Sequence, residues 1–297
     1  MRAFRRKPVQ RVLIFLAVAL GLYLGLIWFG QRWLLYPSWI VRDPGTSLVL
    51  PPHERLVMTS DQGPIEALLM LGRGVSAEAA GPLVIVAHGN GEWAEHRALE
   101  MGRYVRSGIS VLLPEYRGYG RSAGRPTQAR LTRDFVAWRD RIAERPEVDA
   151  DRIAYHGRSL GGGVVGQLTA KRPPAALVLE STFTRIADHP AAKLGPPFMI
   201  RDPYDTLAVV RDLDLPILVL RSPRDEVIPG THGERLAAAA QDATLVTFDG
   251  GHNDPLPPSA WDAILDYMRH MGMLGEATAD EADDADLHAG PGGTEAD

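Results

Sequence analysis

A serine in a glycine-flanked turn offers the clearest candidate chemistry in this sequence. Residues 157–161 read Gly-Arg-Ser-Leu-Gly and fit the pattern G-x-S-x-G, which places a serine hydroxyl on a sharp turn between a strand and a helix. Residues two before and two after the serine nearly touch in such a turn, so only small side chains fit there. The pattern therefore predicts that Ser159 is a nucleophile, held above the N-terminus of a helix.

A second match to the same pattern, at residues 120–124, has the wrong surroundings. Glycines and a proline flank Ser122, which predicts a loop with no strand directly before it and no helix directly after it. Ser159 instead follows an alternating, β-rich segment, and a helix is expected from there to Arg172, before two prolines. We therefore take Ser159 as the nucleophile and Ser122 as a coincidental match. The alternative for Ser159 is a helix N-cap in a glycine-rich turn.

Two further residues have the types and positions that would activate this serine. A serine hydroxyl attacks well only when a base removes its proton and a third group orients that base. His252 is the expected base, because it lies in a loop after the strand expected at residues 244–248. Asp225 is the expected orienting acid, because it follows the strand expected at residues 217–220. The chain order Ser159, Asp225, His252 is that of α/β-hydrolases.

Other titratable residues keep competing roles open. Glu180 ends the strand after the serine turn and is the rival acid, while the alternative for Asp225 is a turn or capping aspartate. His88 also follows a strand, but its loop suits another task. His156 lies inside the strand before the serine, where packing or hydrogen bonding is favoured. The alternative for His252 is a solvent-facing loop histidine.

An acyl-transfer site also needs donors for the negative oxygen of the tetrahedral intermediate. One expected donor is the backbone N–H of Leu160, the residue after the nucleophile. The second is expected from the glycine-containing loop at residues 88–92, either from Asn90 or from Gly91. The alternative is that Asn90 and Gly91 form a plain tight turn.

The elements that position these residues alternate between strand and helix. Short apolar runs such as residues 83–87 are typical of strands buried on both faces. Repeated alternation predicts an α/β fold with a mostly parallel central sheet and helices on both faces. Ligands in such sheets bind beyond the carboxyl ends of the strands, where all the candidate residues fall.

The N-terminus predicts a membrane anchor. Residues 12–29 carry no charge and would span about 27 Å as a helix, close to the thickness of a bilayer core. Five basic residues precede this stretch, which places the N-terminus in the cytoplasm and the remaining chain on the extracytoplasmic side. A cleaved signal peptide and a buried helix are the alternatives. An aromatic belt at the far interface is expected from Trp28, Trp33, Tyr36 and Trp39.

Composition excludes several classes of chemistry. The chain has no cysteine, which excludes disulfides, thiolate catalysis and cysteine metal sites. Its net charge is −5 and no basic patch is interleaved with aromatic residues, which argues against nucleic-acid binding. Zinc-protease, phosphate-loop and dinucleotide-binding motifs are missing, and the chemistry expected here needs no cofactor and no metal.

Five segments in this order resemble an α/β-hydrolase, and most closely its Bem46-like branch, which includes membrane-associated serine hydrolases. The resemblance covers roughly residues 50–272 and rests on residues 88–91, 114–122, 157–162, 222–229 and 251–254. It implies hydrolysis of esters or thioesters, with lipid or acylated-protein substrates in some eukaryotic members. Many relatives carry a glycine-rich segment ending in His-Gly before the acid, where this chain has Leu-Arg-Ser-Pro-Arg at residues 220–224.

The expected division of the chain is a basic cytoplasmic N-terminus (1–11), a transmembrane helix (12–30), a juxtamembrane linker (31–49), an α/β-hydrolase domain (50–273) with a small cap (181–210), and a disordered acidic tail (274–297). The expected activity is that of a membrane-anchored serine hydrolase of carboxylic esters or thioesters, acting on a small-molecule or lipid substrate. A serine peptidase and a catalytically silent, membrane-tethered scaffold are the alternatives. The sequence leaves the acyl chain length and the oligomeric state open.

Overall fold

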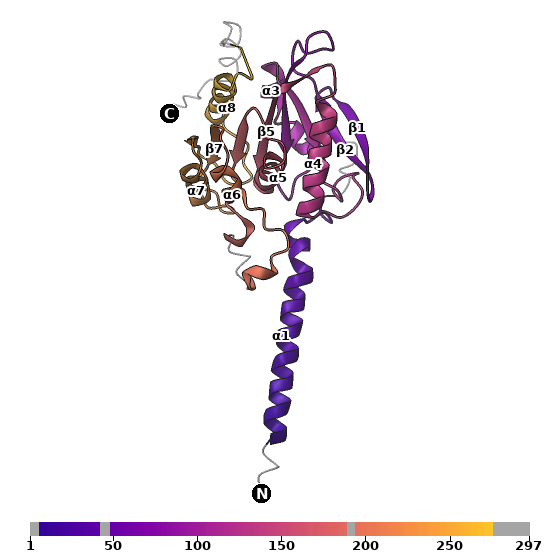
Figure 1. The fold of residues 1–297 in the computed structure, drawn as a ribbon, viewed down its shortest axis with the longest axis vertical. Coiled ribbons are helices and arrows are strands. Elements are labelled where there is room, and N and C mark those ends of the chain that lie inside the picture. The colour runs from indigo at the N-terminus through magenta and orange to yellow at the C-terminus, as the bar shows by residue number, and fades with distance from the viewer. Residues whose placement is uncertain (1–5, 42–47, 189–193, 276–297) are drawn as a thin grey trace, which may run out of the picture.

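The computed structural model describes residues 6–41, 48–188 and 194–275, as a globular body from which one long helix projects (Figure 1). The body contains one eight-stranded sheet with the strand order β1-β2-β4-β3-β5-β6-β7-β8. Its strands are β1 (Glu54–Ser60), β2 (Gly63–Met70), β3 (Gly81–Ala87), β4 (Ser110–Pro114), β5 (Val148–Arg158), β6 (Leu177–Glu180), β7 (Ile217–Arg221) and β8 (Ala243–Thr247). Only β2 runs antiparallel to its neighbours β1 and β4, and every other pairing is parallel. The predicted mostly parallel α/β sheet is thus confirmed.

Helices cover both faces of this sheet. One face carries α4 (Gln128–Ile142), α5 (Leu160–Thr169), α6 (Thr206–Arg211) and α7 (Thr231–Ala239), and the other carries α2 (Ala94–Ala98), α3 (Gly102–Arg106) and α8 (Pro258–His270). Successive strand residues enter the two cores in turn: Leu83 and Ile85 pack on the first side, Val84 and Val86 on the second. This alternation follows from the two-residue period of a strand, and it explains why the central strands are apolar throughout.

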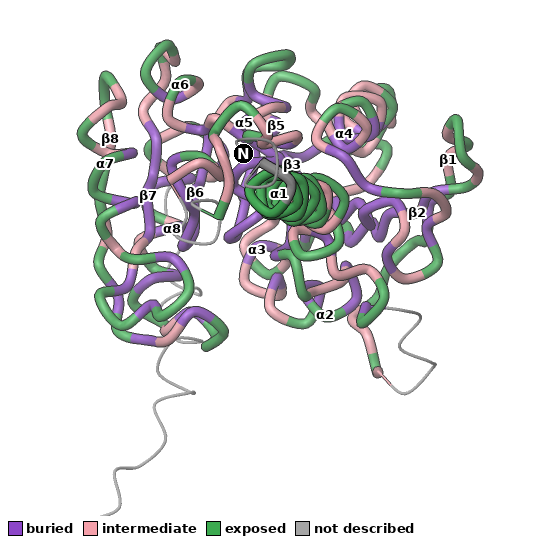
Figure 2. Tube along the Cα trace, turned by 90° about the horizontal axis from the view of Figure 1, so that it is seen from below, coloured by how far each residue is buried: buried purple, intermediate pink, exposed green. Residues whose placement is uncertain are grey.

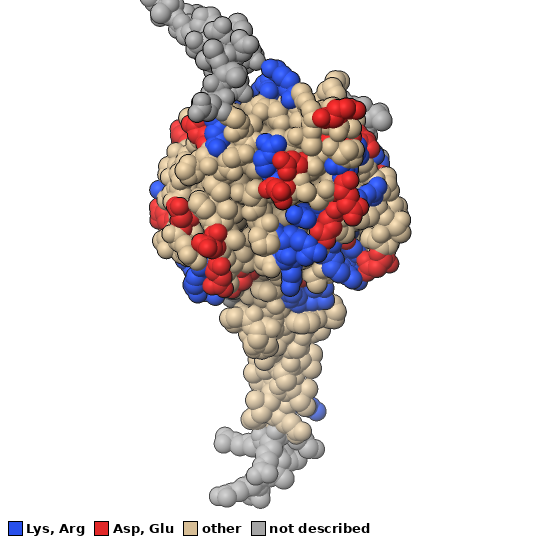
Figure 3. Space-filling view, turned by 45° about the horizontal axis from the view of Figure 1, so that its top comes forward, with Lys and Arg blue, Asp and Glu red and all other residues tan. Residues whose placement is uncertain are grey.

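The projecting helix is α1 (Arg6–Leu35), and its stretch Pro8–Leu35 is long and apolar enough to cross a membrane. Figure 2 shows α1 exposed on nearly all sides, in contrast to the buried strands of the body. Figure 3 shows the stem almost free of charged side chains, with Lys and Arg gathered on the part of the body next to it. An N-terminal helix that could anchor the protein in a membrane is therefore present.

The helix continues further than the sequence predicts. The expected linker at residues 31–49 begins as the last turns of α1, and Arg32 in these turns pairs with the buried Asp202 through Nε and Oδ2 at 2.6 Å. The expected role of Tyr36 in an aromatic belt is wrong, because Tyr36 is buried and its hydroxyl lies 2.9 Å from that of Tyr204. Trp33 stacks on Trp39 at 4.8 Å with both rings partly exposed.

The cap and the tail are described only in part. Residues 194–210 of the expected cap contain a short 3-10 turn at Pro197–Met199 and the helix α6. Residues 189–193 of the cap, 42–47 of the expected linker and most of the expected acidic tail lie outside the described residues.

Candidate active site

The turn between β5 and α5 holds Ser159 in a strained conformation. The serine has φ 52° and ψ −117°, a region that costs a non-glycine residue about 1–3 kcal/mol. A Cβ on Gly161 would lie 2.0 Å from the carbonyl oxygen of Ala87, and one on Gly157 would lie 2.5 Å from that of Gly161. The neighbouring backbone thus allows only glycine at both flanking positions, as the pattern predicts.

The strained turn is fixed by hydrogen bonds to the next strand. The backbone N–H of Ser159 donates to the carbonyl oxygen of Glu180 at 2.9 Å, and Thr182 Oγ1 donates to the carbonyl oxygen of Ser159 at 2.6 Å. These two bonds hold the serine between β6 and the start of the cap. The side-chain hydroxyl is left free for other partners.

Three side chains from distant parts of the chain form one hydrogen-bonded series. Ser159 Oγ lies 3.0 Å from Nε2 of His252, and Nδ1 of His252 lies 2.8 Å from Oδ2 of Asp225. Asp225 follows β7 and His252 follows β8, so both reach the serine across the carboxyl ends of parallel strands. All three residues are buried.

The surroundings of Asp225 set its charge and the orientation of the histidine. Burial by itself would raise the pKa of Asp225, but hydrogen bonds from His252 and from the backbone N–H of Ile228 outweigh it and hold that pKa below its usual range. Oδ1 accepts from the N–H groups of Val227 and Ile228 at 2.9 and 2.7 Å. A carboxylate only accepts hydrogen bonds, so Nδ1 of His252 carries the proton and Nε2 is free to accept from Ser159.

Ser122, the second serine in a G-x-S-x-G match, is occupied elsewhere. Its Oγ accepts from the backbone N–H of Glu66 at 2.9 Å and lies 3.4 Å from the carbonyl oxygen of Glu115. Gly120 and Gly124 both have positive φ values, so they shape a loop rather than a strand-to-helix turn. Ser122 therefore ties this loop to β2.

The predicted oxyanion donors lie in the two segments that flank the serine. Leu160 is the first residue of α5, and Asn90 and Gly91 lie in the loop after β3. The carbonyl oxygen of Asn90 accepts from the hydroxyl of Tyr119 at 2.9 Å, and this bond fixes the position of the loop. A Cβ on Gly91 would meet nothing within 4 Å, so space is open beside that residue.

The two other histidines in this region are both buried and bonded. His88 Nε2 lies 3.1 Å from Glu115 Oε1, and its ring stacks on Tyr116 at 3.8 Å. His156 lies between Tyr104 and Glu180, with its Nε2 2.9 Å from Glu180 Oε2. Burial lowers the pKa of His156, so its imidazole is neutral. Neither ring has the contact with Ser159 that His252 makes.

Sequence reasoning missed a buried charge cluster beneath the serine. Glu180, the rival acid, pairs with Arg97 and, at 3.1 Å, with Nε of Arg158. Burial alone would raise the pKa of Glu180, but Arg97, His156 and Arg158 together hold it well below its usual range. Glu180 is thus an ionised member of this cluster, while the carboxylate that contacts His252 is that of Asp225.

Arg158 joins this cluster to the loops around the serine. Its guanidinium pairs with Glu92, which in turn accepts from the N–H of Gly89 at 2.8 Å, and it also donates to the carbonyl oxygen of His252. An arginine at the buried end of a central strand requires acidic partners, and this was the available sequence signal. Within the described ranges, no group of three or more His, Asp or Glu side chains is arranged to hold a metal ion.

Comparison with known proteins gives the same fold and a family. Residues 78–201 match the family described as serine aminopeptidase, S33. An uncharacterised protein of Mycobacterium tuberculosis is 35% identical over 287 residues, covering 93% of this chain and 99% of the relative. The protein bem46 of Schizosaccharomyces pombe is 31% identical over 230 residues, covering 72% of this chain and 76% of the relative.

A solved structure with little sequence similarity shares the architecture. Est1E from Butyrivibrio proteoclasticus superposes with a TM-score of 0.60 at 17% identity, covering 73% of this chain and 98% of Est1E. At that identity the likeness concerns the fold. The sheet order, the serine turn and the relatives agree with one another, and the chain belongs to the α/β-hydrolase superfamily, in its Bem46-like branch.

Proposed function

We propose that this protein is a membrane-anchored serine hydrolase that cleaves carboxylic esters or thioesters through an acyl-enzyme. The observation that carries the proposal is the hydrogen-bonded series from Ser159 Oγ through His252 to Asp225, at 3.0 and 2.8 Å, on a strained strand-to-helix turn. Backbone strain of this kind persists only where the surrounding structure enforces it, and it clusters at functional sites.

In the proposed reaction, Ser159 Oγ attacks the substrate carbonyl while its proton passes to Nε2 of His252. Asp225 stabilises the imidazolium that forms. The N–H of Leu160 and that of Asn90 or Gly91 donate to the oxyanion, and a donor of this kind contributes about 10²–10³ in rate.

Collapse of the tetrahedral intermediate breaks the bond to the alcohol or thiol, which leaves with the proton from His252. The acyl group is then an ester on Ser159. A water molecule attacks this ester while His252 takes its proton. The second tetrahedral intermediate then collapses, Ser159 Oγ leaves with the proton from His252, and the products are a carboxylic acid and free Ser159. Every proton in this cycle moves among Ser159, His252, the leaving group and water, so this chemistry is complete without a cofactor.

The proposed location rests on α1 and on the basic residues that precede the apolar stretch. The span is long enough to cross a bilayer, and the positive-inside rule puts the N-terminus in the cytoplasm and the catalytic body on the extracytoplasmic side. A hydrolase held at a membrane meets lipid esters and acylated proteins at high local concentration, which favours such substrates.

A serine peptidase is the second candidate, because the matching family is described as a serine aminopeptidase. The expected cap spans only residues 181–210, and a segment this short favours an ester over selection of a peptide terminus. We expect the detergent-purified chain to hydrolyse p-nitrophenyl esters and to leave aminoacyl p-nitroanilides intact, with Ser159→Ala inactive on both. Faster turnover of the anilides would favour the peptidase. A folded wild-type chain without turnover of either would favour a tethered scaffold.

A further inference from the structure

A short part of the cap, residues 194–200, lies along the membrane helix rather than over the sheet. The hydroxyl of Tyr23 donates to the carbonyl oxygen of Leu194, and Gln31 Nε2 donates to that of Met199 at 3.0 Å. Between these bonds, a Cβ on Gly195 would lie 3.1 Å from Ile27. The three helix residues are spaced four apart, so they form one face of α1 against which the segment packs.

This packing determines how deep residues 194–200 would lie in a membrane. Tyr23 precedes the end of α1 at Leu35 by about 18 Å along the helix axis, at 1.5 Å per residue. It also lies about 9 Å inside the end of the uncharged stretch 12–29. Segments that rest in a membrane interface bury their apolar side about 5–10 Å deep. The contact with Tyr23 therefore brings Leu194 to membrane depth whenever α1 spans the bilayer.

The chemistry of residues 194–200 suits that depth. The segment reads Leu-Gly-Pro-Pro-Phe-Met-Ile and has no charged side chain, and Phe198 is 86% exposed in the protein alone. Its two prolines have no N–H to satisfy. The N–H groups of Met199 and Ile200 donate to the carbonyl oxygens of Pro196 and Pro197 at 2.9 and 3.1 Å. Four of the seven backbone positions thus have no N–H or a paired one, which lowers the cost of placing them in lipid.

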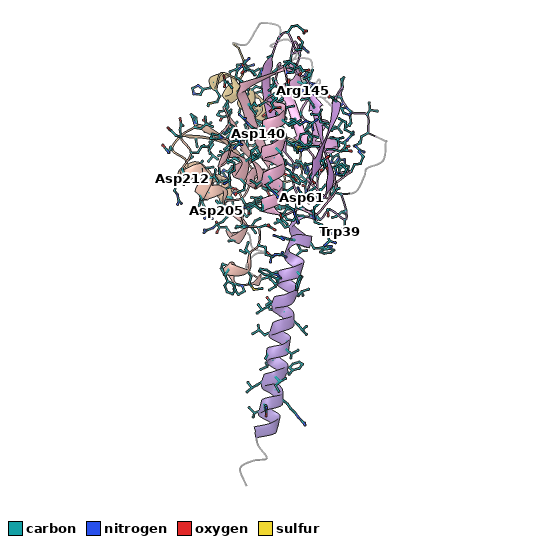
Figure 4. All side chains as sticks on the ribbon, turned by 45° about the vertical axis from the view of Figure 1, so that its right-hand side comes forward. Trp39, Asp61, Asp140, Arg145, Asp205 and Asp212 are labelled. Carbon is teal, nitrogen blue, oxygen red and sulfur yellow. The ribbon has the colours of Figure 1, made fainter. Side chains whose placement is uncertain are left out.

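The charged residues that follow this segment, Arg201 and Asp202, lie at its body side. Arg201 lies over the Trp28 ring at 4.9 Å, and Asp202 pairs with Arg32. Tryptophan and arginine are the residues that anchor proteins at the level of lipid headgroups. Trp39 lies at the same end of the body, where the C-terminal end of α1 joins it (Figure 4).

We propose that residues 194–200 insert into the leaflet at which α1 ends, with Phe198 among the lipid acyl chains. The inference rests on the membrane anchoring proposed above, and its partner is the bilayer itself. The cap then connects the leaflet to the catalytic serine, because its first residues include Thr182, which bonds the backbone of Ser159. This arrangement favours lipid or acylated substrates whose acyl chain lies in the same leaflet.

The absence of cysteine makes a direct test possible. Phe198→Cys in the full-length chain is labelled with a nitroxide and reconstituted into phosphatidylcholine nanodiscs, and its collisions with oxygen and with a water-soluble nickel chelate are compared. Leu26→Cys, at a position 73% exposed on α1, is the control for lipid. Val57→Cys is the control for water, at a position 50% exposed whose carbonyl oxygen accepts from Arg141 at 2.7 Å, near the C-terminal end of α4 and away from the stem.

We expect the oxygen-to-nickel accessibility ratio at position 198 to match that at position 26 and to exceed that at position 57 severalfold. A ratio at position 198 equal to that at position 57, with position 26 in lipid, would overturn the inference alone. Nickel access at both 198 and 26 would overturn the membrane anchor together with it. Ester hydrolysis by Ser159 is measured separately on a soluble substrate, so failure of the proposed chemistry gives a different result.

Discussion

Replacing Glu180 by glutamine tests whether the buried charge cluster is separate from the proposed catalytic series of Ser159, His252 and Asp225. Glu180 is 2% exposed and contacts two guanidinium groups, those of Arg97 and Arg158. Glutamine keeps the shape of the side chain and one acceptor oxygen but removes the charge. Removing one member of a buried ion pair costs about 3–5 kcal/mol, because the other charge stays buried without its partner.

The local contacts place the expected loss at the lower end of that range. Arg97 keeps Glu100, and Arg158 keeps Glu92, so neither cation is left without a carboxylate. We expect Glu180→Gln to lower the free energy of unfolding by about 3 kcal/mol, which corresponds to a fall in Tm of about 6–12 °C for a body of this size. Glu100→Gln is the matched control: Glu100 also pairs with Arg97 but is 36% exposed, so a loss below about 1 kcal/mol is expected.

The lowered pKa of Glu180 also predicts how the stability difference between wild type and Glu180→Gln changes with pH. The pKa of Glu180 is lowered in the folded protein, so its stabilisation is present above the unfolded glutamate pKa of about 4.3 and is lost as the pH falls toward the folded value. The stability gap between wild type and Glu180→Gln is therefore constant from pH 7 to 5. It narrows by about 1–2 kcal/mol between pH 4.3 and pH 3.

Thermal and denaturant unfolding in detergent, followed by tryptophan fluorescence, measures these differences, and ester turnover below the Tm measures catalysis. Glu180→Gln should keep turnover within about tenfold of wild type, whereas Asp225→Asn should lose about 10⁴ in kcat by stabilising the wrong histidine tautomer. A Glu180→Gln variant with unchanged Tm, or with the turnover loss of Asp225→Asn, would refute the assignment of the two acids.

Three further substitutions test the turn and its supports. Gly161→Ala should prevent accumulation of folded protein, because its Cβ would lie 2.0 Å from a backbone carbonyl oxygen of β3; a soluble, active variant in an expression and turnover assay would contradict this. Ser122→Ala should keep turnover and lose about 1–3 kcal/mol in denaturant unfolding, because it leaves the N–H of Glu66 unpaired. Arg158→Gln should lower kcat more than it raises KM, because the loops on both sides of the serine lose their shared anchor; an effect confined to KM would argue against that role.

The sequence predicted the elements whose surroundings are determined locally. The central strands are buried on both faces, so an apolar run such as residues 83–87 is sufficient to identify one. The serine turn is likewise predictable, because its glycines are required by backbone contacts within a few residues. The chain order of Ser159, Asp225 and His252 then followed from placing each residue after a strand.

Features that depend on long-range contacts were missed. The continuation of α1 to Leu35 is accompanied by the pairing of Arg32 with Asp202, 170 positions away, which no local pattern reports. Tyr36 has the composition of an interfacial residue, but contact with Tyr204 buries it. The charge cluster around Glu180 draws on separate elements, and its partners cannot be assigned before the fold is known.

The most direct test of the proposed mechanism is covalent labelling of the detergent-purified protein with a fluorophosphonate. We expect wild type and Ser122→Ala to be labelled and Ser159→Ala to remain unlabelled, with mass spectrometry placing the adduct on the peptide that contains Ser159. Labelling that persists in Ser159→Ala, or a folded wild type that takes up no label, would contradict a nucleophile at that position.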